Sequence, residues 1–189
     1  MARAVVLLGP AGSGKSTVGT ELGRLGLAWR DWEPRLLEAW GDRQQFLANK
    51  EAALAALHAE IRTFIDSAES AAVLESTGLS DREFLDELLR EQPGTLFVRL
   101  DVSEVEALRR AAGRPQGGHL ADDLEATRAV WRAFATHVAQ NRRVDLVIDT
   151  ESVGPAAAGT RCRTSGSSSV NSRARSSAAR SSPVNRPPC

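Results

Sequence analysis

Apolar residues occur in short continuous runs along the first 150 residues of the chain. The runs lie at 4–8, 71–74, 95–100 and 144–148, with a weaker one at 27–30. An unbroken apolar run of this length is typical of a strand that is buried on both faces of a parallel sheet. The pattern therefore predicts a sheet of five strands.

Stretches with the periodicity of an amphipathic helix separate these runs. They cover residues 15–25, 49–68, 80–91, 103–112 and 121–141. Strands that alternate with helices form βαβ units, whose crossovers are right-handed almost without exception. We therefore expect an α/β fold, with a mostly parallel five-stranded sheet and helices on both of its faces.

The pattern stops near residue 154. Residues 155–189 are rich in Ser, Arg, Ala and Pro and contain six arginines but no acidic residue, so residues 1–154 carry a formal charge of −6 in a chain that is neutral overall. A segment with so few large apolar side chains cannot offset the entropy lost on ordering. We predict one folded domain at 1–154 and a disordered tail at 155–189. A shifted reading frame in GC-rich coding sequence would produce a tail of this composition.

Composition and charge exclude several classes of protein. An acidic body is not typical of a nucleic-acid-binding domain, so only the basic tail offers contacts to phosphates. The apolar run at 4–8 is too short for the core of a signal peptide, and no run is long enough to span a membrane. Both cysteines, Cys162 and Cys189, lie in the tail, so the body has neither a disulfide nor a thiolate metal site. We expect a cytoplasmic monomer without a membrane partner.

A phosphate-binding motif follows the first predicted strand. Residues 9–16 read G-P-A-G-S-G-K-S and fit the pattern G-x-x-x-x-G-K-[ST] in full, with a buried run before them and a helical stretch after them. The glycines let backbone N–H groups converge on one point, to which the following helix directs its positive end. In this motif Lys15 reaches the β- and γ-phosphates, and the hydroxyl of Ser16 binds Mg²⁺. The predicted ATP-binding residues are Gly9, Ala11, Gly12, Ser13, Gly14, Lys15, Ser16 and Thr17.

The absence of several motifs narrows the choice among classes of P-loop protein. No D-x-x-G switch of a GTPase occurs, and the one candidate for an N-K-x-D motif, N-K-E-A at 49–52, fails at its last position. The L-S-G-G-Q signature of transporter ATPases is absent too, and residues 1–154 are few for a remodelling or recombination ATPase. A small kinase remains, with its own acceptor site and lid.

Residues 1–152 resemble the small P-loop kinases of the shikimate kinase, gluconate kinase and nucleoside monophosphate kinase group. The segment G-S-G-K-S-T-V-G at 12–19 is similar to the opening of shikimate kinases, and W-R-D-W-E at 29–33 resembles their aromatic-x-Asp-x-Asp motif, with Glu in place of the second Asp. R-A-A-G-R-P at 110–115 resembles the lid region, and D-L-V-I-D-T at 145–150 resembles the last strand, whose following loop touches the adenine. The resemblance implies a P-loop NTPase fold with a short lid.

The resemblance also implies roles for charged residues outside the P-loop. Asp31 would orient or deprotonate the acceptor hydroxyl or hold Mg²⁺; its alternative is a cap at the start of a helix. Glu75 ends an apolar strand, where it would be a second acid beside Mg²⁺ or one partner of a strand-end salt bridge. Among Arg109, Arg110 and Arg114 we expect one catalytic arginine that stabilises the transferring phosphoryl group, and Arg114 is the first choice. Arg110 would also contact the nucleotide. The alternative is that Arg109 and Arg110 are ordinary solvated charges on a helix.

The acceptor is less well defined by the sequence. Thr77 and Gly78 are placed to line its pocket, and Arg30 and Arg43 to bind an anionic group. At 46–47 the chain reads F-L, where shikimate kinases carry an arginine that grips the substrate carboxylate. We predict an ATP- and Mg²⁺-dependent kinase for a small hydroxylated or phosphorylated metabolite. Two alternatives stay open: a nucleotide-binding regulatory protein with slow ATP hydrolysis, and an impaired nucleotide binder with an altered C-terminus.

Overall fold

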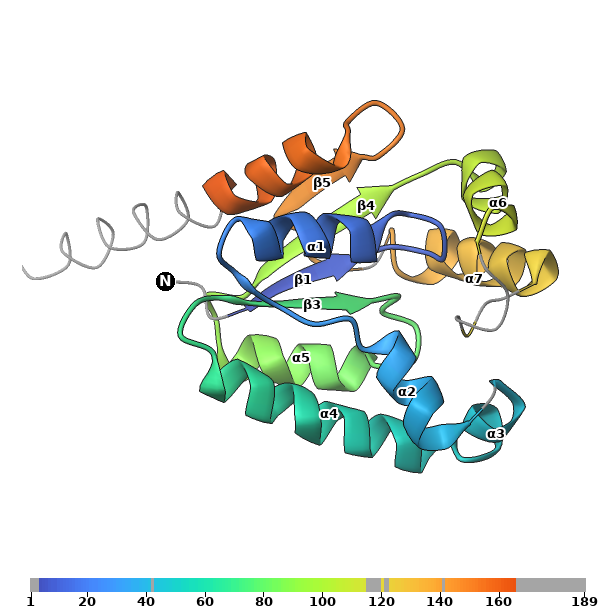
Figure 1. The fold of residues 1–189 in the computed structure, drawn as a ribbon, viewed down its shortest axis with the longest axis horizontal. Coiled ribbons are helices and arrows are strands. Elements are labelled where there is room, and N and C mark those ends of the chain that lie inside the picture. The colour runs from blue at the N-terminus through green and yellow to red at the C-terminus, as the bar shows by residue number, and fades with distance from the viewer. Residues whose placement is uncertain (1–3, 42, 115–119, 121–122, 141, 166–189) are drawn as a thin grey trace, which may run out of the picture.

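A five-stranded parallel sheet forms the centre of the molecule (Figure 1). The computed structural model describes residues 4–41, 43–114, 120, 123–140 and 142–165. The strands are β1 (Ala4–Leu8), β2 (Ala28–Trp29), β3 (Ala72–Ser76), β4 (Leu96–Asp101) and β5 (Leu146–Asp149). They lie in the order β2-β3-β1-β4-β5, and each neighbouring pair is parallel. The predicted α/β fold is confirmed.

Helices connect these strands. They are α1 (Lys15–Arg24), α2 (Glu33–Trp40), α3 (Arg43–Ala48), α4 (Lys50–Ser67), α5 (Arg82–Glu91), α6 (Glu104–Ala112) and α7 (Leu124–His137), and residues 155–165 form a further helix. All five helical stretches expected from the periodicity are present, whereas α2 and α3 are additional. Both are too short to show a clear period, although Pro34 favours a helix start at that point. In the described part of the chain, no helix has the length and apolarity needed to cross a membrane.

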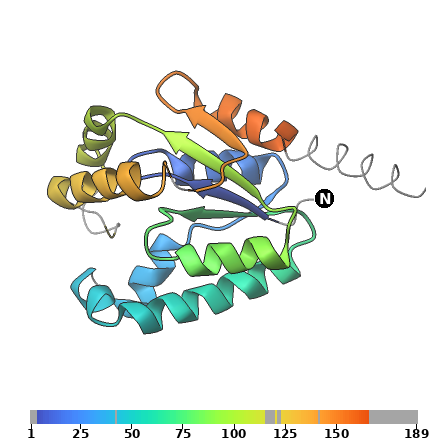
Figure 2. The same cartoon turned by 180° about the vertical axis from the view of Figure 1, so that it is seen from behind.

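The two faces of the sheet have separate hydrophobic cores. Helices α4, α5 and α7 cover one face, where they pack on Val6 and Leu8 of β1 (Figure 2). Helix α1 and the helix at 155–165 cover the other face, where they pack on Val5 and Leu7. All five residues of β1 are buried, as expected for a strand between two helical layers.

The helix at 155–165 corrects the predicted boundary of the tail. Ala158 and Cys162 are 0% and 1% exposed and belong to the core beneath α1. A Cβ at Gly159 would lie 3.2 Å from Cβ of Glu21, so this helix approaches α1 closely. The prediction of disorder from residue 155 is wrong for 155–165, because small residues at i and i+4 are enough for a helix that packs this closely. Residues 166–189 lie outside the described residues.

The strands bring the polar ends of several segments to one edge of the sheet. Because the strands are parallel, their carboxyl ends lie on the same side, where ligands bind in open α/β sheets. The register pairs Leu8 with Ser76 at the ends of β1 and β3, and Asp101 with Asp149 at the ends of β4 and β5. The loop from β1 to α1 begins at this edge.

Candidate active site

The loop between β1 and α1 has the shape that its motif predicts. Gly12 and Gly14 have φ values of 83° and 87°, a region that glycine adopts without strain. A Cβ at Gly12 would lie 2.6 Å from the carbonyl oxygen of Ala107, so the loop packs directly on α6. The amide of Gly9 donates to the carbonyl of Ser76 at 3.1 Å and ties the loop to β3.

The amino end of α1 offers free N–H groups to an anion. Gly14 is its N-cap, no side chain caps the helix, and no acidic residue lies in its first turn. Unpaired N–H groups and the positive end of the helix dipole together favour a phosphate at this position. The hydroxyl of Ser13 is buried without a partner among the described residues, the amide of Ser13 donates to the carbonyl of Pro10 at 3.2 Å, and Thr17 is exposed.

Lys15 lies over the same loop. Its Nζ donates to the carbonyls of Gly9 at 3.0 Å and Pro10 at 3.1 Å. Burial lowers the pKa of Lys15, because the ammonium group has lost water, while the charge of Glu75 opposes that effect. The ammonium is therefore held at the phosphate loop beside a carboxylate.

Lys15, Ser16, Asp31 and Glu75 come together from three segments; we call them the carboxylate cluster. The hydroxyl of Ser16 donates to Oε2 of Glu75 at 3.0 Å. The pKa of Glu75 is raised to about 7: burial is the main cause, the charge of Lys15 and the hydrogen bond from Ser16 oppose it, and the charge of Asp31 and a hydrogen bond with its carboxyl add to it. Oε1 of Glu75 is buried and accepts no hydrogen bond from a described residue. The role of Glu75, as a second acid beside Mg²⁺ or as one partner of a strand-end salt bridge, remains a prediction.

Asp31 lies just before α2 and close to Glu75. Its Oδ1 accepts a hydrogen bond from the amide of Glu33 at 3.2 Å, whereas the N-cap of α2 is Trp32, and no side chain makes a capping bond there. The charge of Asp31 and a hydrogen bond with its carboxyl raise the pKa of Glu75. Asp31 therefore places a second carboxyl group beside Glu75, and its predicted roles remain predictions.

The end of α6 and the start of α2 approach Lys15 as well. The charges of Glu75 and Glu33 raise the pKa of Lys15 and the charge of Arg114 lowers it, so all three side chains lie within electrostatic range of Lys15. Oε1 of Glu33 accepts a hydrogen bond from the amide of Leu120 at 2.8 Å. The predicted lid residues 115–119 lie outside the described residues.

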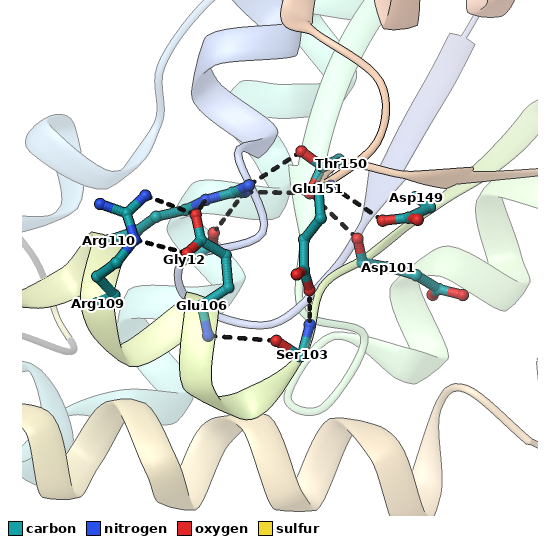
Figure 3. Close-up of polar contacts among 9 residues, drawn as sticks. All are labelled: Gly12, Asp101, Ser103, Glu106, Arg109, Arg110, Asp149, Thr150 and Glu151. Carbon is teal, nitrogen blue, oxygen red and sulfur yellow. Dashed lines mark hydrogen bonds and ion pairs between the residues drawn. The ribbon is translucent and has the colours of Figure 1, made fainter.

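A second cluster lies on the other side of the P-loop and consists of Gly12, Asp101, Arg110 and Thr150; we call it the Arg110 cluster (Figure 3). Nη1 of Arg110 donates to the carbonyl of Gly12 at 3.3 Å and to Oγ1 of Thr150 at 3.1 Å. Its Nη2 donates to the carbonyl of Thr150 at 2.9 Å. The Thr150 hydroxyl donates to the carbonyl of Asp101 at 3.1 Å. These bonds join the P-loop, α6 and the loop after β5.

Glu106 holds Arg110 from the side of α6. It accepts hydrogen bonds from Arg110 and from Arg109, and these bonds lower the pKa of Glu106 to about 2. The side chain of Arg109 is 71% exposed and pairs with Glu106 of the same helix. Ser103 caps α6 by accepting a hydrogen bond from the amide of Glu106 at 3.2 Å.

Of the residues predicted to form the acceptor pocket, the structure places only some close to one another. The guanidinium of Arg30 lies 5.1 Å from the ring centre of Trp32 and 5.2 Å from that of Phe64. Trp32 is 3% exposed and belongs to the core, although its Nε1 has no partner among the described residues. Gly78 packs against α7, and Thr77 precedes it in the same loop. Arg43 begins α3, and its side chain lies outside the described part of the chain.

The carboxylate cluster also fits a partial ligand set for Mg²⁺. Among the described residues no group of three or more His, Cys, Asp or Glu side chains could enclose a metal ion. Mg²⁺ is usually held by one or two protein oxygens together with water and substrate phosphates. Ser16, Asp31 and the unpaired Oε1 of Glu75 supply oxygens of this kind next to the phosphate loop.

Comparisons with known proteins agree with this fold. No family model and no curated protein matches the sequence significantly. Among solved structures, a gluconokinase from Sinorhizobium meliloti 1021 is similar with a TM-score of 0.62 and 20% identity, over 92% of this chain and 97% of that one. A shikimate kinase from Acinetobacter baumannii, solved with shikimate, has a TM-score of 0.59 and 21% identity, over 90% of this chain and 94% of that one. A deoxyadenosine kinase from M. mycoides, solved with dATP, has a TM-score of 0.58 and 15% identity, over 85% and 97%.

These likenesses define the architecture. The chain has the P-loop NTPase fold, with a wholly parallel sheet in the order β2-β3-β1-β4-β5. It matches these three structures over nearly their whole length, so it shares their fold from end to end.

Proposed function

We propose that this chain is an ATP- and Mg²⁺-dependent kinase that transfers the γ-phosphoryl group to a hydroxyl or phosphate of a small metabolite. The observation that carries the proposal is the carboxylate cluster. A P-loop that only binds nucleotide needs no second carboxylate, yet Asp31 and Glu75 lie together beside Lys15 and Ser16. A buried carboxyl with a raised pKa is typical of a site where protons move.

Each residue of the cluster has a role in phosphoryl transfer. The bond between the γ-phosphorus of ATP and the oxygen that bridges it to the β-phosphate breaks, and a bond between the γ-phosphorus and the acceptor oxygen forms. ADP is the leaving group. Lys15 stabilises the negative charge on the phosphates, and Arg114 stabilises the transferring group. Asp31 accepts the proton of an acceptor hydroxyl or orients that hydroxyl. Mg²⁺, held by Ser16 and an acidic side chain, would neutralise phosphate charge.

The Arg110 cluster would position the nucleotide. Arg110 is fixed on the P-loop by Gly12 and on the loop after β5 by Thr150. A guanidinium held in this way reaches the nucleotide without losing side-chain entropy on binding. We assign ATP binding to Arg110 and the residues of the P-loop.

The acceptor is a small molecule whose identity the fold does not select. The three similar structures are named for gluconate, shikimate and deoxyadenosine, which are chemically different. Leu47, which stands where shikimate kinases carry an arginine, is 52% exposed and cannot bind a carboxylate. Shikimate is therefore the least favoured of the three.

The experiment is ATP consumption by the purified protein with Mg²⁺, measured across a panel of acceptors. The panel holds nucleoside monophosphates, sugar acids, shikimate and antibiotic alcohols, and Lys15→Ala is the blank. We expect one class of acceptor to stimulate ADP release, and we expect this stimulation to be absent in Lys15→Ala. Nucleotide binding without acceptor-dependent turnover would reject the kinase and favour a regulatory or impaired nucleotide binder.

A further inference from the structure

Arg30 lies at the carboxyl end of β2, immediately before Asp31 of the carboxylate cluster. Successive side chains of a strand point to opposite faces of its sheet. The ring of Trp29 packs on α1, where a Cβ at Gly19 would lie 2.5 Å from it. Arg30 points to the other face, which α4 covers (Figure 1), and its guanidinium lies beside Phe64 of that helix.

Two aromatic rings hold this guanidinium in place. Its Cζ lies 5.1 Å from the ring centre of Trp32 and 5.2 Å from that of Phe64, and the two rings meet edge to face at 5.5 Å. Trp32 is buried and Phe64 packs on the same core, so both rings are fixed. A cation within about 6 Å of a ring centre is attracted to the ring face. Arg30 is therefore positioned before a ligand binds, which reduces the entropy lost on binding.

The N–H groups of Arg30 have no acceptor in the described part of the chain. The rings stabilise its charge but supply no oxygen, and Arg30 forms no ion pair and no hydrogen bond with a described residue. Glu60 of α4 pairs with Arg35 at 3.5 Å instead. Asp31 accepts a hydrogen bond from the amide of Glu33. Because Arg30 is exposed, its five donors are open to a ligand that supplies oxygens.

We propose that Arg30 is a specificity-determining residue that binds a carboxylate or phosphate group of the phosphoryl acceptor. A guanidinium recognises such groups through pairs of charge-assisted hydrogen bonds. Because Asp31 is the next residue, an anionic group on Arg30 places the rest of the acceptor beside the carboxylate cluster. The inference rests on the proposed kinase function and narrows its acceptors to anionic metabolites.

The test measures binding, so that its outcome does not depend on turnover. AMP is compared with adenosine and gluconate with gluconamide, because the members of each pair differ at the charged group. Dissociation constants are measured by calorimetry with a non-hydrolysable ATP analogue and Mg²⁺ on the P-loop, which keeps the anions from binding there. We expect at least one anion to bind about tenfold more tightly than its neutral counterpart, as for a charge-assisted hydrogen bond. The pair that shows the preference distinguishes phosphate from carboxylate, and no preference in either pair would overturn the proposal.

Variants of two neighbouring arginines assign the preference to a side chain. Arg30→Gln should abolish it, whereas Arg30→Lys keeps a cation over the rings without the planar pair of donors and should weaken the binding of the anion less. Arg35→Gln is the matched control, because Arg35 lies on α2, is 52% exposed and pairs with Glu60. A preference that survives in Arg30→Gln, or that Arg35→Gln reduces equally, would overturn the proposal.

ADP release separates this inference from the kinase function on which it rests. Anion binding that depends on Arg30, without ADP release for any compound of the acceptor panel, would support the anion site and count against the kinase. Turnover of an uncharged acceptor with undiminished kcat/KM in Arg30→Gln would keep the kinase and overturn the role of Arg30.

Discussion

The carboxylate cluster and the Arg110 cluster lie on two sides of one P-loop and differ in how completely their polar atoms are paired. In the Arg110 cluster the guanidinium bonds to Glu106, Gly12 and Thr150. In the carboxylate cluster Glu75 has one bonded oxygen and one buried oxygen without a partner. The guanidinium of Arg110 is therefore held from three sides, whereas the carboxyl of Glu75 keeps one oxygen without a partner among the described residues.

This difference shows that the fold tolerates a cost in stability at the carboxylate cluster. Burying a carboxyl group without full hydrogen bonding destabilises a protein, and such residues are typical of functional sites. The cost is visible as the raised pKa of Glu75, whereas the hydrogen bonds at Glu106 lower its pKa. Four predictions test whether the two clusters are separate in function.

The largest effect is expected from Lys15→Ala. Loss of the ammonium removes the main positive charge on the β- and γ-phosphates, so acceptor-dependent turnover should fall by about 10²-fold or more. The measurement is steady-state ADP release with the best acceptor. Lys50→Ala is the matched control, because Lys50 is the only other lysine and is exposed at the start of α4. Unchanged turnover in Lys15→Ala would contradict the role of the P-loop.

The pH dependence of stability isolates Glu75. Its pKa is about 7 in the folded protein and 4.5 in the reference state, so the folded protein binds more protons between these values. Stability should therefore fall as the pH rises through this window, by up to about 3 kcal/mol. In Glu75→Gln this loss should be absent. Denaturant unfolding at pH 5 and pH 8 measures it, with Glu83→Gln as the exposed control; parallel losses in wild type and Glu75→Gln would reject the shift.

Arg110→Gln sharpens the comparison from the nucleotide side. Because Arg110 bonds to Gly12 and Thr150 and makes no hydrogen bond or ion pair with Asp31 or Glu75, its loss should raise KM for ATP by about tenfold and change kcat less. Arg109→Gln is the control, since Arg109 precedes it on α6, also bonds to Glu106 and is 71% exposed. A fall in kcat with unchanged KM would place Arg110 at the transferring phosphoryl group instead.

The smallest effect is expected from Thr150→Val. The substitution keeps the shape of the side chain but removes the hydroxyl that joins Arg110 to Asp101. Loss of these two hydrogen bonds of the Thr150 hydroxyl should raise KM for ATP by about threefold. Ser152→Ala is the control, because Ser152 bonds only within the same loop, to the carbonyl of Asp149 at 3.3 Å. Equal effects of the two substitutions would mean that the loop, and not this hydroxyl, sets nucleotide affinity.

The sheet and the P-loop could be predicted from the sequence because their signals are local. Each buried strand is an apolar run, and the motif at 9–16 contains its own conformational requirements, which the φ values of Gly12 and Gly14 confirm. The roles of Asp31, Glu75 and Arg114 remain predictions, but the structure places Glu75 and Arg114 within electrostatic range of Lys15 and Asp31 beside Glu75.

Other parts depend on contacts between distant segments, which one sequence does not reveal. Thr150 and Arg110 are 40 residues apart, and nothing near either residue indicates their bond. The N-cap of α5 is Asp81, whose side chain makes no capping bond and instead accepts a hydrogen bond from the hydroxyl of Ser76. The helix at 155–165 was missed because small residues give a weak helical pattern.

The helix at 155–165 also determines where the chain can be cut. A stop codon after residue 154 would remove Ala158 and Cys162 and leave α1 and one sheet face with an uncovered apolar surface, which favours aggregation. A stop codon after residue 165 would keep every described contact of that core. Residue 165, eleven residues beyond the boundary expected from composition, is therefore the rational end point for a shortened expression variant.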